Sequence, residues 1–154
     1  MGNDQMTQNH DKQMLRRAKA ASFWSKDPST RIGAVVHCAG QVLGRGHNGF
    51  PPGIAEDERM NDREQKYELV VHAEMRALIS AGRAAHGGTL YLWGFKGPPC
   101  TNCTKHLIEA GIRRVVASGT PTPERWAESL RKSEAMLAEA GILFETYDPE
   151  EIDR

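Results

Sequence analysis

The sequence has 154 residues, which is the size of one ordinary domain. Twenty Lys and Arg residues balance twenty Asp and Glu residues, whereas a protein that binds along a nucleic-acid backbone carries an excess of basic residues. Three cysteines are too few, and odd in number, for a disulfide scaffold. The composition therefore predicts a globular domain that does not bind long nucleic acids, and it leaves the roles of Cys38, Cys100 and Cys103 open.

The first thirteen residues are polar and contain no apolar run of the kind found in signal peptides. The longest weakly polar stretch, residues 32–40, is too short to cross a bilayer. We therefore expect a cytoplasmic protein without a membrane segment.

Helical and strand-like patterns alternate along the chain. The expected elements are, in chain order, a helix over 11–25, strands over 32–37 and 41–46, a helix over 72–81, a strand over 89–93, a helix over 101–110, a strand over 112–117, a helix over 123–140 and a strand over 142–147. Between them, the charge-rich segment 54–68 is expected to be a solvated loop or a short helix. Strands that alternate with helices after an opening hairpin favour a layered α/β sandwich.

The helix over 123–140 is expected to be the longest. Its apolar and small residues recur on one stripe, which indicates that it packs against another element. The stripe comprises Trp126, Leu130, Ser133, Leu137 and Ala140.

Two short motifs carry the chemistry, and each is placed at the start of an expected helix. The first is His72 to Glu74 and the second is Pro99 to Cys103. In the second motif, two cysteines three residues apart share one face of the first helical turn. The positive end of the helix dipole lowers the pKa of a thiol there, and the thiolate is the form that binds metal. With His72 of the first motif, the three side chains would leave the fourth tetrahedral position of Zn²⁺ to water, as in catalytic sites.

Glu74 lies two residues after His72 and is not needed as a ligand. Two thiolates and one imidazole neutralise Zn²⁺, so the ion acidifies water less than it would with three histidines and a nearby base is needed. Glu74 is expected to carry protons from water to a ring nitrogen and then to departing ammonia. The combination H-x-E and P-C-x-x-C is the signature of zinc deaminases.

Longer segments resemble the deoxycytidylate (dCMP) deaminases. They are SKDPSTRIGAVV, GHNGFPPG, KYELVVHAEMRAL and PPCTNCTKHLIEAGIRRVV, and they fall within residues 22–117. The resemblance implies a three-layer α/β/α sandwich around a mixed, about five-stranded sheet. The single deaminase domain would span residues 1–154, with a C-terminal helix and strand in 118–154.

The resemblance also implies an activity and its residues. Zinc would be held by His72, Cys100 and Cys103, with Glu74 as the proton shuttle, and hydroxide would attack C4 of cytosine to give dUMP and ammonia. The substrate would be a small nucleotide, and the protein would be a homo-oligomer, either a dimer or a hexamer.

Five residues are candidates for substrate contact. By resemblance, Asn48 reaches the sugar, and Ser25 and Lys26 lie near the nucleotide. Phe50 is expected in a loop, where its flat ring could stack on a base. Arg76 stands where the family usually has Asn, and either a phosphate contact or a surface salt bridge is expected of it.

Two other functions are compatible with the same motifs. The same chemistry could act on a free base, a nucleoside or another amino-heterocycle, because the sequence departs from the family at Arg76 and also at Pro52, where bacterial relatives often have Arg. Adenosine in tRNA is disfavoured by the neutral charge. The chain could instead be a non-catalytic, zinc-stabilised binding module, although such a site would have no use for Glu74.

Overall fold

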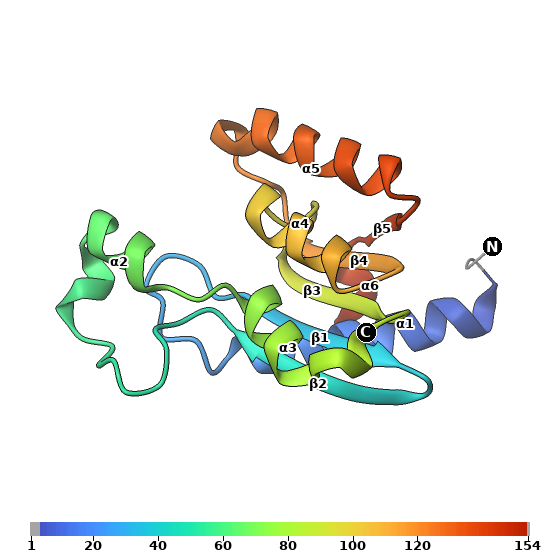
Figure 1. Ribbon diagram of the computed structural model, residues 1–154, viewed down its shortest axis with the longest axis horizontal. Helices are drawn as coiled ribbons and strands as arrows, with labels where there is room; N and C mark the ends of the chain where they lie inside the picture. The colour runs from blue at the N-terminus through green and yellow to red at the C-terminus, as the bar shows by residue number, and fades with distance from the viewer. Residues whose placement is uncertain (1–3, 154) are drawn as a thin grey trace.

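The protein is described from a computed structural model that covers residues 4–153. Five strands form one sheet, and six α-helices and three short 3-10 helices connect them (Figure 1). The strands are β1 Gly33–Cys38, β2 Gln41–His47, β3 Thr89–Phe95, β4 Arg114–Thr120 and β5 Leu143–Tyr147. The helices are α1 Gln5–Ser22, η1 Glu58–Asn61, α2 Arg63–Leu69, α3 Ala73–Ala81, η2 Gly82–Ala85, α4 Thr101–Glu109, η3 Glu124–Trp126, α5 Ala127–Glu139 and α6 Pro149–Ile152.

The sheet is mixed, as predicted. Its strand order is β2-β1-β3-β4-β5, with β1 antiparallel to both β2 and β3. β3, β4 and β5 run parallel to one another and are joined by the crossover helices α4 and α5. The expected hairpin is therefore present at one edge, and the parallel α/β half of the domain follows it.

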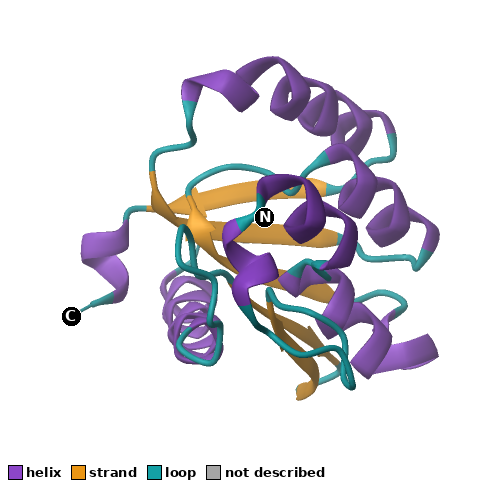
Figure 2. Cartoon of the chain, turned by 90° about the vertical axis from the view of Figure 1, so that its left-hand side faces the viewer, coloured by secondary structure: helices purple, strands orange, loops and turns teal. Residues whose placement is uncertain are grey.

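Helices cover both faces of the sheet, which confirms the predicted three-layer sandwich (Figure 2). On one face α3, α4 and α5 bury a core with one set of strand side chains, which includes Ala77, Leu90, Leu107, Val115 and Leu137. On the other face α1 and α6 bury the alternate set, which includes Leu15, Val35, Tyr91, Val116 and Ile152. Neighbouring residues Val35 and Val36 belong to opposite cores because successive side chains of a strand point to opposite faces.

A buried carboxylate fastens α1 to the sheet. Asp11 is fully buried and accepts four hydrogen bonds, two on each oxygen. Arg114 donates one bond to each oxygen, at 2.7 and 2.5 Å, and the hydroxyls of Tyr91 and Tyr147 donate at 3.0 and 2.7 Å. Arg114 also pairs with Glu145 on β5. This network joins the first helix to three strands.

Two glycines on β2 let the backbone of α3 approach the strand closely. A Cβ atom on Gly46 would lie 2.6 Å from the carbonyl oxygen of Ala73, and one on Gly44 would lie 2.2 Å from that of Ala77. Real Cβ atoms are not found this close to backbone atoms, so α3 sits where it does because β2 presents no side chain to it. The first turn of α3 carries the candidate site residues.

The prediction for residues 123–140 is partly wrong. A 3-10 turn occupies Glu124–Trp126, and α5 has 13 residues, whereas α1 has 18 and is the longest helix. α1 begins at Gln5 because Asp4 caps it by accepting a hydrogen bond from the Thr7 amide at 2.8 Å. Within the predicted stripe Ser133 and Leu137 are buried, but Ala140 is exposed.

The charge-rich segment 54–68 forms two short helices, of which one was expected. Asp57 caps η1 and Asp62 caps α2, each through its side-chain oxygen. No helix was expected after the last strand, where the structure has α6. Within residues 4–153 every helix is too short or too polar to span a lipid bilayer. The ends of the predicted domain, residues 1–3 and 154, lie outside the described residues.

Candidate active site

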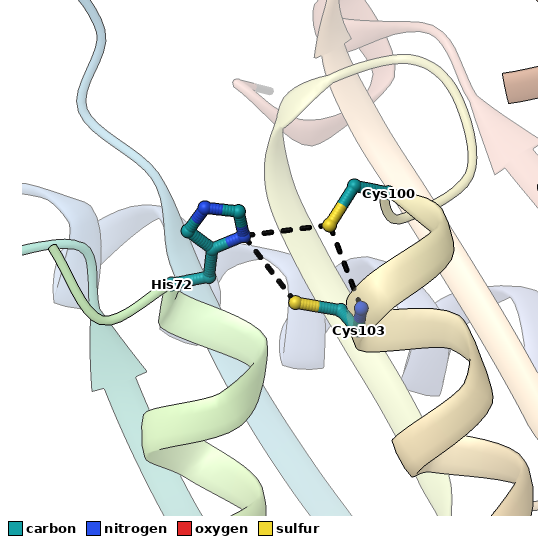
Figure 3. Close-up of side chains that lie close together, drawn as sticks. All are labelled: His72, Cys100 and Cys103. Atoms are coloured by element: carbon teal, nitrogen blue, oxygen red, sulfur yellow. Dashed lines mark hydrogen bonds between the residues drawn. The ribbon is translucent and has the colours of Figure 1, made fainter. Parts of the chain in front are cut away.

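Three side chains converge where α3 and α4 begin side by side (Figure 3). His72 is the N-cap of α3 and Cys100 is the N-cap of α4, and both have extended backbone angles. His72 makes no capping hydrogen bond with its side chain, so its ring is free to face the two cysteines. Cys103 lies in the first turn of α4 and is buried. The predicted grouping of these three residues is therefore present.

The distances between these side chains fit a zinc ion. Nδ1 of His72 lies 3.5 Å from Sγ of Cys100 and 3.3 Å from Sγ of Cys103. Zinc bonds of about 2.3 Å to sulfur and about 2.05 Å to nitrogen, at the tetrahedral angle, separate the two ligand atoms by about 3.6 Å. All three ligand atoms lie within 4.8 Å of one another. The donor set and its spacing are those of a zinc site with three protein ligands.

The two thiols differ in their readiness to lose a proton. A hydrogen bond from Cys103 lowers the pKa of Cys100 to about 4, against the effect of burial and with the help of His72. Sharing that proton with Cys100, together with burial, raises the pKa of Cys103. The pair thus holds one proton and one negative charge. A zinc ion bound by both sulfurs supplies the positive charge that the shared proton otherwise provides.

Glu74 lies in the first turn of α3 and is 6% exposed. Burial raises the pKa of its carboxyl group above the ordinary value, while the neighbouring imidazole of His72 lowers it. It does not belong to the group of side chains whose atoms could share an ion. A buried carboxyl with a raised pKa beside a metal site can both accept and return a proton near neutral pH.

A cavity of about 780 Å³ opens onto these residues, and His72, Glu74 and Cys100 line it. Its walls come from the loop after α1, from α2, from the end of β3 and from the start of α5, which lie on the left-hand side of Figure 1. The remaining lining side chains include Asp27, Thr30, Asn48, Arg63, Lys66, Phe95, Arg125 and Trp126. This volume is in the range of small-molecule sites.

Residues 8–118 match the family model of the cytidine and deoxycytidylate deaminase zinc-binding region. The chain belongs to the cytidine and deoxycytidylate deaminase family. It is therefore a zinc-dependent hydrolase. Among the described residues, His72, Cys100 and Cys103 are grouped closely enough to hold the ion.

Individual proteins agree with this membership. The chain is 33% identical to an uncharacterised deaminase from the luxG 3′ region of Aliivibrio fischeri, over 85% of this chain and 88% of the relative. It is 31% identical to the deoxycytidylate deaminase of Mus musculus, over 81% of this chain and 72% of the relative. The crystal structure of the cyanophage S-TIM5 dCMP deaminase in complex with dCMP and dUMP has the same fold, with a TM-score of 0.69, 24% identity and coverage of 90% and 97% of the two chains.

In this deaminase, Asn48 lines the cavity, but its side-chain amide is engaged with the chain itself. Oδ1 accepts a hydrogen bond from the amide of Ile32 at 2.9 Å. Nδ2 donates to the carbonyl oxygen of Thr30 at 2.9 Å and to Asp27 at 3.3 Å. Both donors are therefore used within the loop, and only the second lone pair of Oδ1 is left for a sugar hydroxyl.

Three other predicted contact residues are not among those that line the cavity. Ser25 is buried, donates to the carbonyl oxygen of Asn48 at 2.8 Å and accepts from the amide of Asp27. Lys26 is exposed and is not among the residues that line the cavity. Phe50 is buried, with the guanidinium of Arg59 6.0 Å from its ring centroid. Ser25 and Phe50 thus support the loops around the site.

Arg76 does not form the salt bridge that was one of its two expected roles, and the phosphate contact stays a prediction. Its guanidinium donates hydrogen bonds to the carbonyl oxygens of Gly49 and Phe50, at 3.1 and 3.0 Å, and it makes no ion pair with a described residue. It lines a separate cavity of about 490 Å³ between α1 and β2. The arginine therefore holds the loop that follows β2.

Sequence reasoning missed the residues that line the cavity from α2 and η3. Lys66 on α2 pairs with Asp27 at 2.9 Å, and the side chain of Asp27 is 3% exposed. Arg63 also comes from α2, and Arg125 and Trp126 come from η3. The basic residues of the charge-rich segment were a usable signal, but η3 lies outside the motifs and gave none.

Proposed function

We propose that the chain deaminates deoxycytidine 5′-monophosphate (dCMP) by hydrolysis, giving dUMP and ammonia. The observation that carries the proposal is the buried Glu74 carboxyl in the same cavity as His72 and Cys100. A purely structural zinc site has no use for such a group, so a binding module is disfavoured. The substrate is supported by the deoxycytidylate deaminases of Mus musculus and Homo sapiens, which are 31% and 30% identical to this chain.

Each side chain has a defined task in this proposal. His72, Cys100 and Cys103 would hold zinc, which when bound acts as a Lewis acid that makes water a nucleophile near neutral pH. Glu74 accepts a proton from the attacking water and delivers it to N3 of the ring as the water oxygen bonds to C4. Glu74 then moves the second proton to the amino group, the C4–N bond breaks and ammonia leaves. The oxygen remains on C4, so one water is consumed and the ring becomes uracil.

The raised pKa of Glu74 suits this task, because the carboxyl group must take up and release a proton in each turnover. Burial excludes bulk water from the carboxyl, so a proton that it accepts passes to the substrate. In this proposal the ring lies in the cavity that His72, Glu74 and Cys100 line.

The proposal is tested by zinc content and by ammonia release. We expect one zinc per chain, and turnover of dCMP in preference to deoxycytidine, cytosine and guanine. Glu74→Gln is expected to retain zinc and to lower kcat by about 10²- to 10⁴-fold. Glu109→Gln is a matched control, because Glu109 is exposed on α4 and does not line the cavity. Normal dCMP turnover by zinc-loaded Glu74→Gln would refute the mechanism, and turnover of cytosine alone would reassign the substrate.

We also propose that the enzyme is a homo-oligomer, a dimer or a hexamer. Two large apolar side chains at the end of α1 support this, because Phe23 is 64% exposed and Trp24 is 75% exposed. Such side chains are enriched where protein surfaces associate. Sedimentation equilibrium is expected to give a multiple of the 17.1 kDa chain mass. A monomer at micromolar concentration would contradict the proposal.

A further inference from the structure

Two arginines from distant parts of the sequence lie at the rim of the active-site cavity. Arg63 is the first residue of α2, and Arg125 lies in η3, just before α5. Figure 1 shows that α2 and the start of α5 are on the same side of the molecule. Both side chains are exposed, and neither forms an ion pair with a residue of the described range 4–153.

An aromatic ring supports each guanidinium group. Arg125 lies over the ring of Trp126, 4.8 Å from its centroid, and Trp126 in turn packs edge-on against Phe95 at 5.4 Å. Arg63 lies over Tyr67, 5.9 Å from the ring centroid. A ring engages the face of a guanidinium, which leaves the N–H groups at its edge free to bind an oxyanion. The two arginines are therefore held in place while their donors remain available.

The other charges of the cavity are already balanced or lie deeper. Lys66 is neutralised by Asp27, with their charged atoms 2.9 Å apart. Glu74 lies at the buried end, beside the metal-binding side chains. The rim thus carries two positive charges without a carboxylate partner. The ligand group that complements them is a dianion at the end of the molecule opposite to the reacting ring.

We propose that Arg63 and Arg125 bind the 5′-phosphate and so select a nucleoside monophosphate over the nucleoside. The inference rests on the proposed function, because the reaction places the ring at Glu74 and leaves the phosphate to point toward the rim. The planar guanidinium matches two phosphate oxygens at once, which an ammonium group does not. The α2 segment and η3 thus become specificity elements of the enzyme.

Binding is measured by calorimetry on zinc-loaded Glu74→Gln, in which turnover is expected to be about 10²- to 10⁴-fold slower than in the wild type. We expect dCMP to bind more tightly than deoxycytidine. Adding Arg125→Ala or Arg63→Ala is expected to weaken dCMP binding by about 10- to 100-fold each, as for the loss of a charge-assisted hydrogen bond, and to leave deoxycytidine binding unchanged. Arg125→Lys is expected to restore part of the loss. Arg131→Ala is the matched control, because Arg131 is exposed on α5 and does not line the cavity.

Ionic strength gives a second readout. Because exposed charges are screened by salt, the affinity for dCMP is expected to fall as salt is added, and the dependence is expected to weaken in Arg125→Ala.

Two results would overturn the inference. One is dCMP binding no tighter than deoxycytidine in Glu74→Gln, and the other is an equal loss for both ligands in the arginine variants. Failure of the proposed function is separate, because it shows as the absence of ammonia release by the wild type. A phosphate-dependent affinity without ammonia release would keep the phosphate site and reject the reaction.

Discussion

Replacing Asp11 by Asn is expected to test how α1 is fastened to the sheet. The carboxylate of Asp11 accepts two hydrogen bonds on each oxygen, from Arg114, Tyr91 and Tyr147. An amide of the same shape has one oxygen and one NH₂ group. Whichever way the amide turns, its NH₂ group faces one N–H of Arg114 and one tyrosine hydroxyl. The hydroxyl can rotate and accept a hydrogen bond from the amide, but the arginine has no acceptor, so its bond is lost and the ion pair with Arg114 disappears.

The magnitude follows from the burial of the group. Asp11 is fully buried, and Arg114 keeps Glu145 as its second partner. Breaking one member of a buried pair costs about 3–5 kcal/mol. The N–H of Arg114 that loses its acceptor costs about 1–3 kcal/mol, and the loss of the ion pair adds to this cost. The total stability of a domain is about 5–15 kcal/mol, so this single change removes a large part of it.

Urea unfolding followed by circular dichroism measures the effect. With a denaturant slope of about 2 kcal/mol/M, the midpoint is expected to fall by about 1.5–2.5 M. Asp153→Asn is the matched control, because Asp153 pairs with Lys19 of the same helix but is half exposed. Exposed pairs contribute about 0–1 kcal/mol, so its midpoint is expected to change little. A loss below about 1 kcal/mol for Asp11→Asn would refute the reasoning.

The pH dependence gives a second check of Asp11. Burial alone would raise the pKa of this carboxyl, but hydrogen bonds from Arg114 and Tyr147 hold it below the ordinary value. The stabilisation is therefore fully present above the unfolded pKa of about 3.9 and is lost as the pH falls through the lower folded pKa. The stability difference between wild type and Asp11→Asn is expected to be constant near pH 7 and to shrink below about pH 4.

Three further predictions concern the site. Gly46→Ala is expected to push α3 away from β2, because the new Cβ would lie 2.6 Å from the carbonyl oxygen of Ala73. The free energy of unfolding is expected to fall by about 1–3 kcal/mol, as measured by denaturant unfolding. The zinc affinity is expected to fall as well, as measured by competition with a chelator. Zinc-free protein is expected to alkylate at Cys100 even at pH 5, because its pKa is about 4, and zinc is expected to protect it, as mass spectrometry would show. Lys66→Met leaves the buried Asp27 without its cation, which is expected to reduce the free energy of unfolding by about 1–3 kcal/mol. The loss is measured as a lower melting temperature.

The metal site could be read from the sequence because its residues lie at fixed places in local structure. The spacing of Cys100 and Cys103 puts both on one helical turn, and His72 and Cys100 are both N-caps. The approach of α3 to α4 depended on the fold. The glycines of β2, which let α3 lie close to that strand, were not recognised as such.

The substrate residues were harder to predict because their partners are distant in the sequence. Both amide donors of Asn48 bond to Thr30 and Asp27, and one guanidinium nitrogen of Arg76 bonds to the loop at 49–50. Nothing in the pattern around either residue shows that these acceptors lie within reach. Arg125 was not considered, because the 3-10 turn that brings it to the cavity interrupts a pattern typical of one continuous helix.

The placement of the zinc-binding side chains on two helices has a consequence for folding. His72 and Cys100 are 28 positions apart, and the chain between them includes α3, η2 and β3. An ion bound by both residues closes this segment into a loop, much as a covalent crosslink would, and reduces the freedom of the unfolded chain. Metal loss is therefore expected to speed amide hydrogen exchange over α3 and the first turn of α4 together. The ion that assists the reaction would thus also stabilise the part of the fold that carries the active site.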